Sequence, residues 1–341
     1  MYHSWLDRWD ERRALRGEEG KKPTDFVLDA ERAFPCAKKM TSIEEFCALA
    51  DQAVVDLAFF DEPSVSDQGF ERVDGWLKFP SDISTDVEQN NVVSAKITES
   101  GAFDQAMVIF HHWNASARNR QIANFFSQRG ITVVEIAMPY HLERSRPGSV
   151  HADYMLSPNL GRTIQSVRQA VLDGRKLIRW LKSEGYREIS VVGMSLGSWV
   201  AGLVAAHDSA VSKASLFLTA GSLADMVWTG RATRLIRDSI EPEIELTDLR
   251  RAWGPLNLEN YELCLARPDL DLHVVLAKRD KVVLPELSER FMRRLKDAGA
   301  RPSILELNCG HYSLAMPPYI LWAGLSLKRF LSCADKSARR A

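Results

Sequence analysis

Gly193-Met194-Ser195-Leu196-Gly197 is the stretch that decides how this sequence is interpreted. It follows the apolar run Ile189-Ser190-Val191-Val192 and precedes a helical pattern that begins at Ser198. A serine between a strand and a helix lies in a sharp turn, and the flanking glycines remove Cβ atoms that would clash there. The turn lifts the hydroxyl toward the N-terminal end of the new helix, where free backbone N–H groups collect. Ser195 is therefore predicted to be a nucleophile.

A base and an acid must accompany such a serine, because its hydroxyl is a poor nucleophile at neutral pH. Asp280 follows the apolar run 272–277, which is predicted to be a buried strand. His311 follows the next predicted strand, 304–307. Ser195, Asp280 and His311 are thus predicted to form a catalytic triad.

Asp225 is a rival for the role of the acid, because it also follows a predicted strand, 214–219. Asp280 is preferred because it lies one strand before His311, with a single helical pattern over residues 286–298 between them. Taken alone, Asp280 would be interpreted as a solvated turn residue and His311 as a loop histidine. Their assignment to the triad therefore depends on the order of the elements, which is strand, acid, helix, strand and histidine.

The developing oxyanion of an acyl-transfer reaction also needs hydrogen-bond donors. The backbone N–H of Leu196, directly after the nucleophile, is predicted to be one donor. The strand predicted over residues 106–110 exits into His111-His112-Trp113, and the N–H of Trp113 is predicted to be the second donor. Adjacent histidines on an extended segment point to opposite faces, so this pair is not interpreted as a metal site.

These motifs resemble the α/β-hydrolase superfamily over roughly residues 75–333. The matching pieces are the elbow at 193–197, the Asp280-x-Val-Val-x-Pro segment, the Gly310-His311 pair and a histidine at an early strand exit. The resemblance implies an α/β-hydrolase fold with a mainly parallel, eight-stranded-type sheet and helices on both faces. In that superfamily the exit often runs His-Gly-x, whereas this chain has His112 at the glycine position.

A second resemblance is carried by the turn Met138-Pro139-Tyr140, followed by Arg144 and Arg146-Pro147. With the motifs above, it is similar to poorly characterised abhydrolase-domain-containing proteins with an N-terminal helical extension.

The predicted organisation has three parts: an N-terminal helical extension over residues 1–74, a hydrolase domain over 75–333, and a tail over 334–341. The first 40 residues are dense in charge without a clear period, and are expected to wrap the body irregularly. Two or three short helical patterns interrupt the strand–helix alternation at about 220–270, and this insertion is predicted to be a cap over the site.

Regular elements are predicted elsewhere from their periodicity. A helix is predicted to start at Thr41-Ser42, with Ser42 and Glu45 forming a capping box. Strands are predicted at 76–79, 92–97 and 131–137, and an amphipathic helix at 163–182.

Composition narrows the classes of function. The 341 residues are 45% hydrophobic and carry a net charge of −1, which gives no basic footprint for nucleic acid. No apolar run is long enough to span a membrane, and the charged N-terminus lacks a secretory signal. The five scattered cysteines are read as reduced thiols of a cytoplasmic protein: Cys36, Cys47, Cys264, Cys309 and Cys333.

The resulting hypothesis is a cofactor-free serine hydrolase acting on a small-molecule ester through an acyl-enzyme. An acyltransferase or perhydrolase with the same triad and a non-catalytic interaction module are the alternatives, and a homodimer is left open. Residues expected to contact the substrate are aromatic, sulfur-containing or next to the predicted oxyanion loop: His112, Met194, Trp199, Met226, Trp228 and Tyr312.

Overall fold

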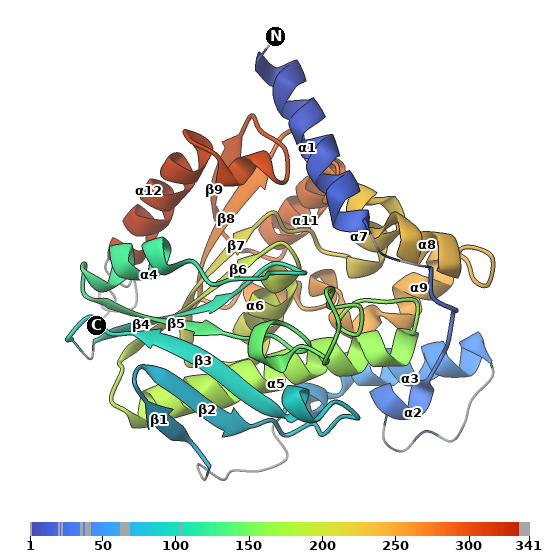
Figure 1. The fold of residues 1–341 in the computed structure, drawn as a ribbon, viewed down its shortest axis with the longest axis horizontal. Helices are drawn as coiled ribbons and strands as arrows, with labels where there is room; N and C mark the ends of the chain where they lie inside the picture. The colour runs from blue at the N-terminus through green and yellow to red at the C-terminus, as the bar shows by residue number, and fades with distance from the viewer. Residues whose placement is uncertain are drawn as a thin grey trace.

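The computed structural model describes residues 2–19, 21, 23–34, 37, 42–61, 69–102 and 104–333, and the predicted tail 334–341 lies outside them. The described residues form one nine-stranded sheet, with strand order β1-β2-β3-β5-β4-β6-β7-β8-β9 (Figure 1). The strands are β1 (Glu71–Val73), β2 (Trp76–Pro80), β3 (Val92–Thr98), β4 (Gln105–Phe110), β5 (Ile131–Ile136), β6 (Glu188–Met194), β7 (Val211–Phe217), β8 (Asp271–Ala277) and β9 (Ser303–Leu307).

Strand direction explains where a site can form. The neighbours from β5 through β4, β6, β7 and β8 to β9 pair in parallel, whereas β1, β2, β3 and β5 pair antiparallel. Parallel strands bring their carboxyl ends to one edge of the sheet, so the chain segments that leave β4, β6, β8 and β9 lie together there.

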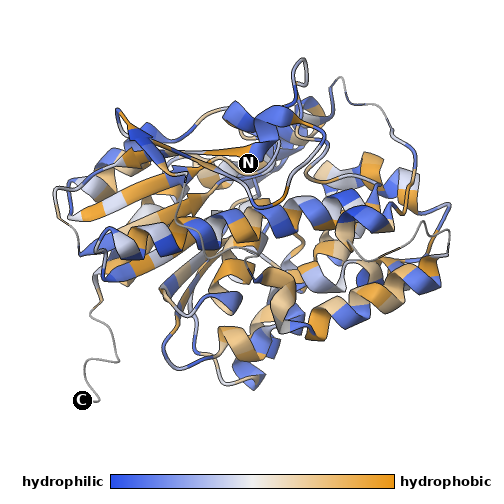
Figure 2. Cartoon of the chain, turned by 90° about the horizontal axis from the view of Figure 1, so that it is seen from below, coloured by the Kyte–Doolittle hydropathy of each residue, from blue (hydrophilic) through white to orange (hydrophobic). Residues whose placement is uncertain are grey.

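Helices cover both faces of the sheet, as predicted. Alternate strand residues face opposite sides, so Met107 packs with α4 (Arg120–Ser127) and α12 (Tyr319–Ser332) in one core cluster. Val108 belongs to the larger cluster on the other face, which includes residues of three further helices: α5 (Leu160–Ser183), α6 (Leu196–His207) and α11 (Pro285–Asp297). Figure 2 shows the strands as largely hydrophobic, whereas the helices mix hydrophobic and hydrophilic residues.

The N-terminal region is more regular than predicted. Tyr2–Glu18 form one helix, α1, rather than an irregular wrap, and α2 (Ala30–Ala33) and α3 (Ile43–Val55) follow it. The capping box predicted at the start of α3 is wrong, because the Ser42 hydroxyl donates to the carboxylate of Glu44 instead.

The N-terminal extension and the domain that contains the sheet share one hydrophobic core. Ala30 and Phe46 belong to the same buried cluster as the central strands. The boundary predicted at residues 74 and 75 falls in the turn between β1 and β2, so the sheet begins slightly before it. β1 was not predicted, because its three residues are all exposed and show no alternation of buried and exposed positions.

The insertion between β7 and β8 is helical. It contains α7 (Leu223–Thr229), α8 (Arg234–Ile240), α9 (Leu246–Ala252) and α10 (Glu262–Leu265). Several of its large apolar side chains, Trp253 among them, are buried in the main core. Within the described residues, no helix has the length and apolar character needed to cross a bilayer.

Candidate active site

Ser195 occupies a strained turn between β6 and α6. Its backbone angles are φ 53° and ψ −123°, a region that non-glycine residues rarely adopt. Such a conformation costs on the order of 1–3 kcal/mol and persists only where the surroundings impose it. Here the Ser195 N–H donates to the Phe217 carbonyl at 2.9 Å, and the Ser198 hydroxyl donates to the Ser195 carbonyl at 2.6 Å.

The two glycines of the elbow are required by close backbone approach. A Cβ at Gly193 would lie 2.1 Å from the carbonyl oxygen of Gly197. A Cβ at Gly197 would lie 2.3 Å from the carbonyl oxygen of Phe110, at the end of β4. Gly193 is therefore required by the tight turn between β6 and α6, and Gly197 by the close approach of α6 to the exit of β4.

The triad predicted from the sequence comes together in space. The Ser195 hydroxyl donates to His311 Nε2 at 3.0 Å, and His311 Nδ1–H donates to Asp280 Oδ2 at 2.7 Å. The other oxygen of Asp280 accepts the backbone N–H groups of Val282 at 2.7 Å and Val283 at 2.9 Å. Asp280 is buried, so these three donors hold a charged carboxylate in one orientation.

Free backbone donors occur at the start of α6 and at the exit of β4. No hydrogen-bond partner occurs among the described residues for the backbone N–H of Leu196, at the start of α6, or for those of His112 and Trp113, after β4. Unpaired N–H groups at a helix start and a neighbouring strand exit suit an oxyanion.

Two neutral histidines brace the loop that carries Trp113. His111 Nε2 accepts the Met138 N–H at 3.1 Å, and His141 Nε2 accepts the Asn114 N–H at 2.9 Å. Each ring then carries its proton on Nδ1, which donates to a backbone carbonyl. Burial lowers the pKa of His141 to about 4 and that of His111 well below its usual value, which keeps both rings in this acceptor state.

No protein-family model and no curated protein sequence matches the chain. Solved structures do match. Acylaminoacyl peptidase from Pyrococcus horikoshii superposes with a TM-score of 0.61 at 11% identity, covering 80% of this chain and 42% of that one. Acetyl xylan esterase 1 from Thermoanaerobacterium sp. superposes with a TM-score of 0.58 at 16% identity, covering 91% of this chain and 100% of that one.

A puromycin-hydrolysing peptidase from Mycobacterium tuberculosis gives a TM-score of 0.54 at 17% identity, covering 74% of this chain and 37% of that one. This chain therefore spans less than half the length of either peptidase. The chain has the α/β-hydrolase fold. Its elbow, acid and histidine lie on the three strand exits described above.

The residues predicted to contact substrate separate into two groups in this α/β-hydrolase fold. Trp199 has no exposed surface and Met226 is 3% exposed, and both side chains lie in the main core. Trp199 lies on α6, whose residues 196–205 are all buried.

The remaining four predicted residues keep some exposed surface. Tyr312 lies next to the triad, with its ring centroid 5.3 Å from that of His311. Met194 and Trp228 are partly buried, and His112 is exposed. These four remain candidates for substrate contact.

The rival acid Asp225 has other partners. It is buried, and its two oxygens accept from the guanidinium groups of Arg250, at 2.8 Å, and Arg290. Cys309 is equally unsuited to chemistry, because burial raises the pKa of its thiol to about 12. Among the described residues, no cluster of three histidine, cysteine or acidic side chains is arranged to hold a metal.

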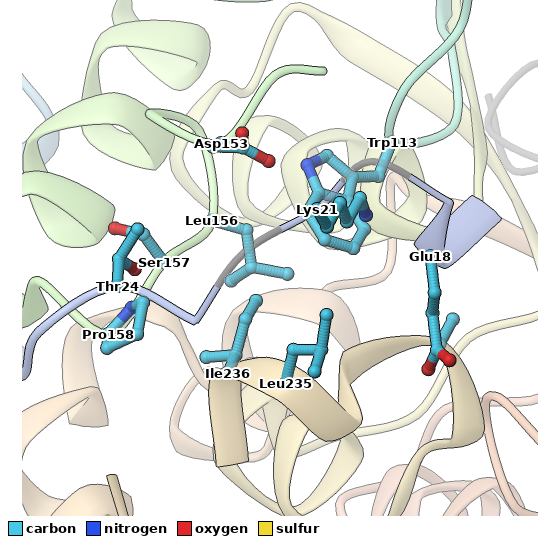
Figure 3. A pocket seen from close by; sticks show the side chains of 11 residues that line it. Glu18, Lys21, Thr24, Trp113, Asp153, Leu156, Ser157, Pro158, Leu235 and Ile236 are labelled. Carbon is cyan, nitrogen blue, oxygen red and sulfur yellow. The ribbon is translucent and has the colours of Figure 1, made fainter. Parts of the chain in front are cut away.

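A small cavity of about 30 Å³ lies beside the predicted oxyanion loop (Figure 3). No triad residue lines it, but Trp113 forms part of its wall, and Lys21 Nζ lies 3.9 Å from the centre of the Trp113 ring. Figure 3 shows Leu156 facing side chains of the helical insertion across the cavity. Its lining is Glu18, Lys21, Thr24, Trp113, Asp153, Leu156, Ser157, Pro158, Ala232, Leu235 and Ile236.

Two parts of this site were not predicted from the sequence. His141 carries no motif, and its role depends on a turn that only the folded chain forms. α1 was also missed as a contributor, although it contacts the loops after β8 and β9 through Arg279 and Ser313.

Proposed function

We propose that this chain is a serine hydrolase of the carboxylesterase type, which cleaves an ester through an acyl-enzyme. The observation that carries the proposal is the continuous hydrogen-bond chain from the Ser195 hydroxyl through His311 to Asp280, at a strained elbow. A hydroxyl that donates to an oriented imidazole is the arrangement needed to generate an alkoxide nucleophile.

The proposed reaction has two halves. Ser195 Oγ attacks the ester carbonyl while His311 Nε2 takes its proton, and Asp280 stabilises the imidazolium that results. The N–H groups of Leu196 and Trp113 hold the oxyanion, and the imidazolium then protonates the departing alcohol. Water attacks the acyl-serine with His311 again as base, which releases the carboxylic acid and restores the serine. No metal or organic cofactor takes part in these steps.

We further propose a compact substrate with a short acyl group. The cavity beside Trp113 is small, and its apolar part is formed by Leu156 together with Ala232, Leu235 and Ile236 of the insertion. In this proposal, part of the 220–270 insertion serves as the cap predicted from the sequence. A small, partly apolar cavity beside the predicted oxyanion loop suits a short acyl chain better than an extended peptide.

The test uses p-nitrophenyl esters of increasing acyl length and a fluorophosphonate probe that labels activated serines. We expect turnover of the short esters, and probe labelling of the wild type that disappears in Ser195→Ala. If the triad acts as a unit, kcat of Ser195→Ala falls by about a million-fold. Equal labelling of both proteins would refute the assignment of Ser195. A matching series of p-nitroanilides separates ester from amide preference.

A further inference from the structure

The N-terminal helix α1 brings a buried carboxylate to the loop that carries His311. Asp10 is 7% exposed, although aspartate is among the residues least often buried without a partner. Its Oδ1 accepts the backbone N–H groups of Tyr312 at 2.7 Å and Ser313 at 3.0 Å. Its Oδ2 accepts the Ser313 hydroxyl at 2.6 Å.

The same network extends to the other side of His311. The Ser313 hydroxyl oxygen accepts the N–H of Gly310 at 2.8 Å. The backbone on both sides of His311 is therefore tied to Asp10, directly at residues 312 and 313 and through a hydroxyl at residue 310. Hydrogen bonds to a charged acceptor are about twice as strong as neutral ones, which suits this carboxylate to fixing a loop.

Gly310 shows how closely the helix and the loop fit. A Cβ at this position would lie 2.5 Å from Asp10 Oδ2. The Asp10 carboxylate cannot move aside without losing the hydrogen bonds to Tyr312 and Ser313. The glycine is thus needed for Asp10 rather than for a special backbone angle at residue 310.

α1 is also fastened to the loop that carries the acid of the triad. Asp7 pairs with Arg279, with one contact at 2.8 Å, and Arg279 directly precedes Asp280. Glu11 pairs with Arg231 at 2.8 Å, and the Arg231 N–H donates to the Lys281 carbonyl. One face of α1 is acidic where the loops it covers are basic, and the fully buried Leu6 anchors it.

We propose that Asp10 is a positioning residue for the reaction, acting through the His311 loop. His311 must keep Nδ1 on Asp280 while Nε2 exchanges a proton with Ser195, so a small loop displacement breaks one of the two contacts. Asp10 holds the loop where both distances, 2.7 and 3.0 Å, are satisfied at once. This inference rests on the proposed function and adds the N-terminal helix to the active site.

The test compares Asp10→Ala with Asp10→Asn, measuring kcat and KM separately on the best p-nitrophenyl ester. We expect kcat of Asp10→Ala to fall about 10- to 100-fold with KM changed little, because misplacement of a reacting group by about 1 Å has effects of that size. Asp10→Asn keeps an oxygen for the two N–H donors and recovers most of the rate. Both variants are checked for folding by thermal unfolding.

Glu11→Ala is the matched control. It removes the ion pairs of α1 with Arg231, at 2.8 Å, and with Lys281, at 3.9 Å, but touches no residue of the His311 loop. It therefore reports the effect of loosening the helix and its contact with the loop after β8. An equal loss of kcat in Glu11→Ala, or wild-type kcat in a folded Asp10→Ala, would overturn the proposal.

Gly310→Ala provides a second route to the same contact if Asp10→Ala does not fold. Its new methyl group displaces the Asp10 carboxylate, so we expect a similar loss of kcat. In a double variant with Asp10→Ala the two losses combine to less than their product, because they remove the same contact. Fully multiplicative losses would refute the shared mechanism.

A readout independent of turnover separates this inference from the proposed function. The proton that His311 shares with Asp280 is observable by NMR as a downfield resonance, identified by its absence in Asp280→Ala. We expect it to broaden or vanish in Asp10→Ala and to persist in Asp10→Asn. If the wild type neither labels nor turns over, the proposed function fails, and this resonance still decides whether Asp10 positions His311.

Discussion

Replacing Asp280 by asparagine is expected to leave the protein folded while nearly abolishing its activity, for a reason that the hydrogen bonds of this side chain make explicit. Oδ1 accepts two N–H groups, from Val282 and Val283, and Oδ2 accepts Nδ1–H of His311. An asparagine has only one oxygen, so it must satisfy one side and present its NH₂ group to the other.

The free-energy cost of each orientation of the asparagine amide decides between them. Pointing the NH₂ at Val282 and Val283 would set donor against donor and leave two buried N–H groups unpaired, at about 1–3 kcal/mol each. Pointing it at His311 keeps both backbone N–H groups paired, because the imidazole moves its proton to Nε2 and accepts one amide N–H at Nδ1. The second orientation wins, and it fixes the wrong tautomer: Nε2–H cannot accept the proton of Ser195.

We therefore expect kcat of Asp280→Asn to fall by about 10⁴-fold, the size found when a triad histidine is held in the wrong tautomer. That factor equals about 5 kcal/mol in transition-state stabilisation. The assay is steady-state hydrolysis of a p-nitrophenyl ester, with the melting temperature measured in parallel. Asp225→Asn is the control for the rival acid and should keep kcat within a few-fold. A folded Asp280→Asn with more than a tenth of wild-type kcat would contradict this reasoning.

Three further predictions follow from other parts of the structure. Gly197→Ala places a methyl group against the Phe110 carbonyl and should destabilise the fold by about 3 kcal/mol, the upper range for overpacking, so an unchanged melting temperature would count against the elbow geometry. His141 and His273 are buried with pKa values lowered to about 4, so their contribution to stability is complete above about pH 6.5 and is lost as the pH falls toward 4. Urea unfolding at pH 7 and pH 5 should differ by about 2 kcal/mol for each, and a difference below 1 kcal/mol in total would refute this. Ala232→Phe fills the cavity beside the oxyanion loop and should cut the rate on longer acyl esters about tenfold relative to acetate, whereas an equal effect on all chain lengths would exclude the cavity as an acyl site.

The sequence predicted best those features whose signals are local. An apolar strand, a small-residue turn and a helical pattern follow one another around Ser195, and each is visible within a few residues. Asp280 and His311 were found in the same way, because each comes just after a buried strand. Parallel strands then bring the three exits to one edge, so local order was enough to predict a common site.

Side-chain direction was predicted less well, because it depends on what covers each element. Trp199 was expected to line a pocket, since one sequence cannot show that α6 is buried on every side. The tryptophan instead packs in the core. His141 was missed for a related reason: its ring braces the loop after β4 through Asn114, which lies 27 residues earlier in the chain.

The helix α1 was missed because its buried stripe does not look apolar. The side chains that face the body are Leu6, Asp10 and Ala14, spaced four residues apart. Leu6 is the only large apolar residue of the three, and the charged Asp10 interrupts the hydrophobic pattern that a helix prediction requires. A carboxylate is stable at such a position only where donors converge on it, and here those donors belong to the backbone beside His311. The buried Asp10 is therefore both the reason that α1 was not predicted and the residue that connects α1 to the active site.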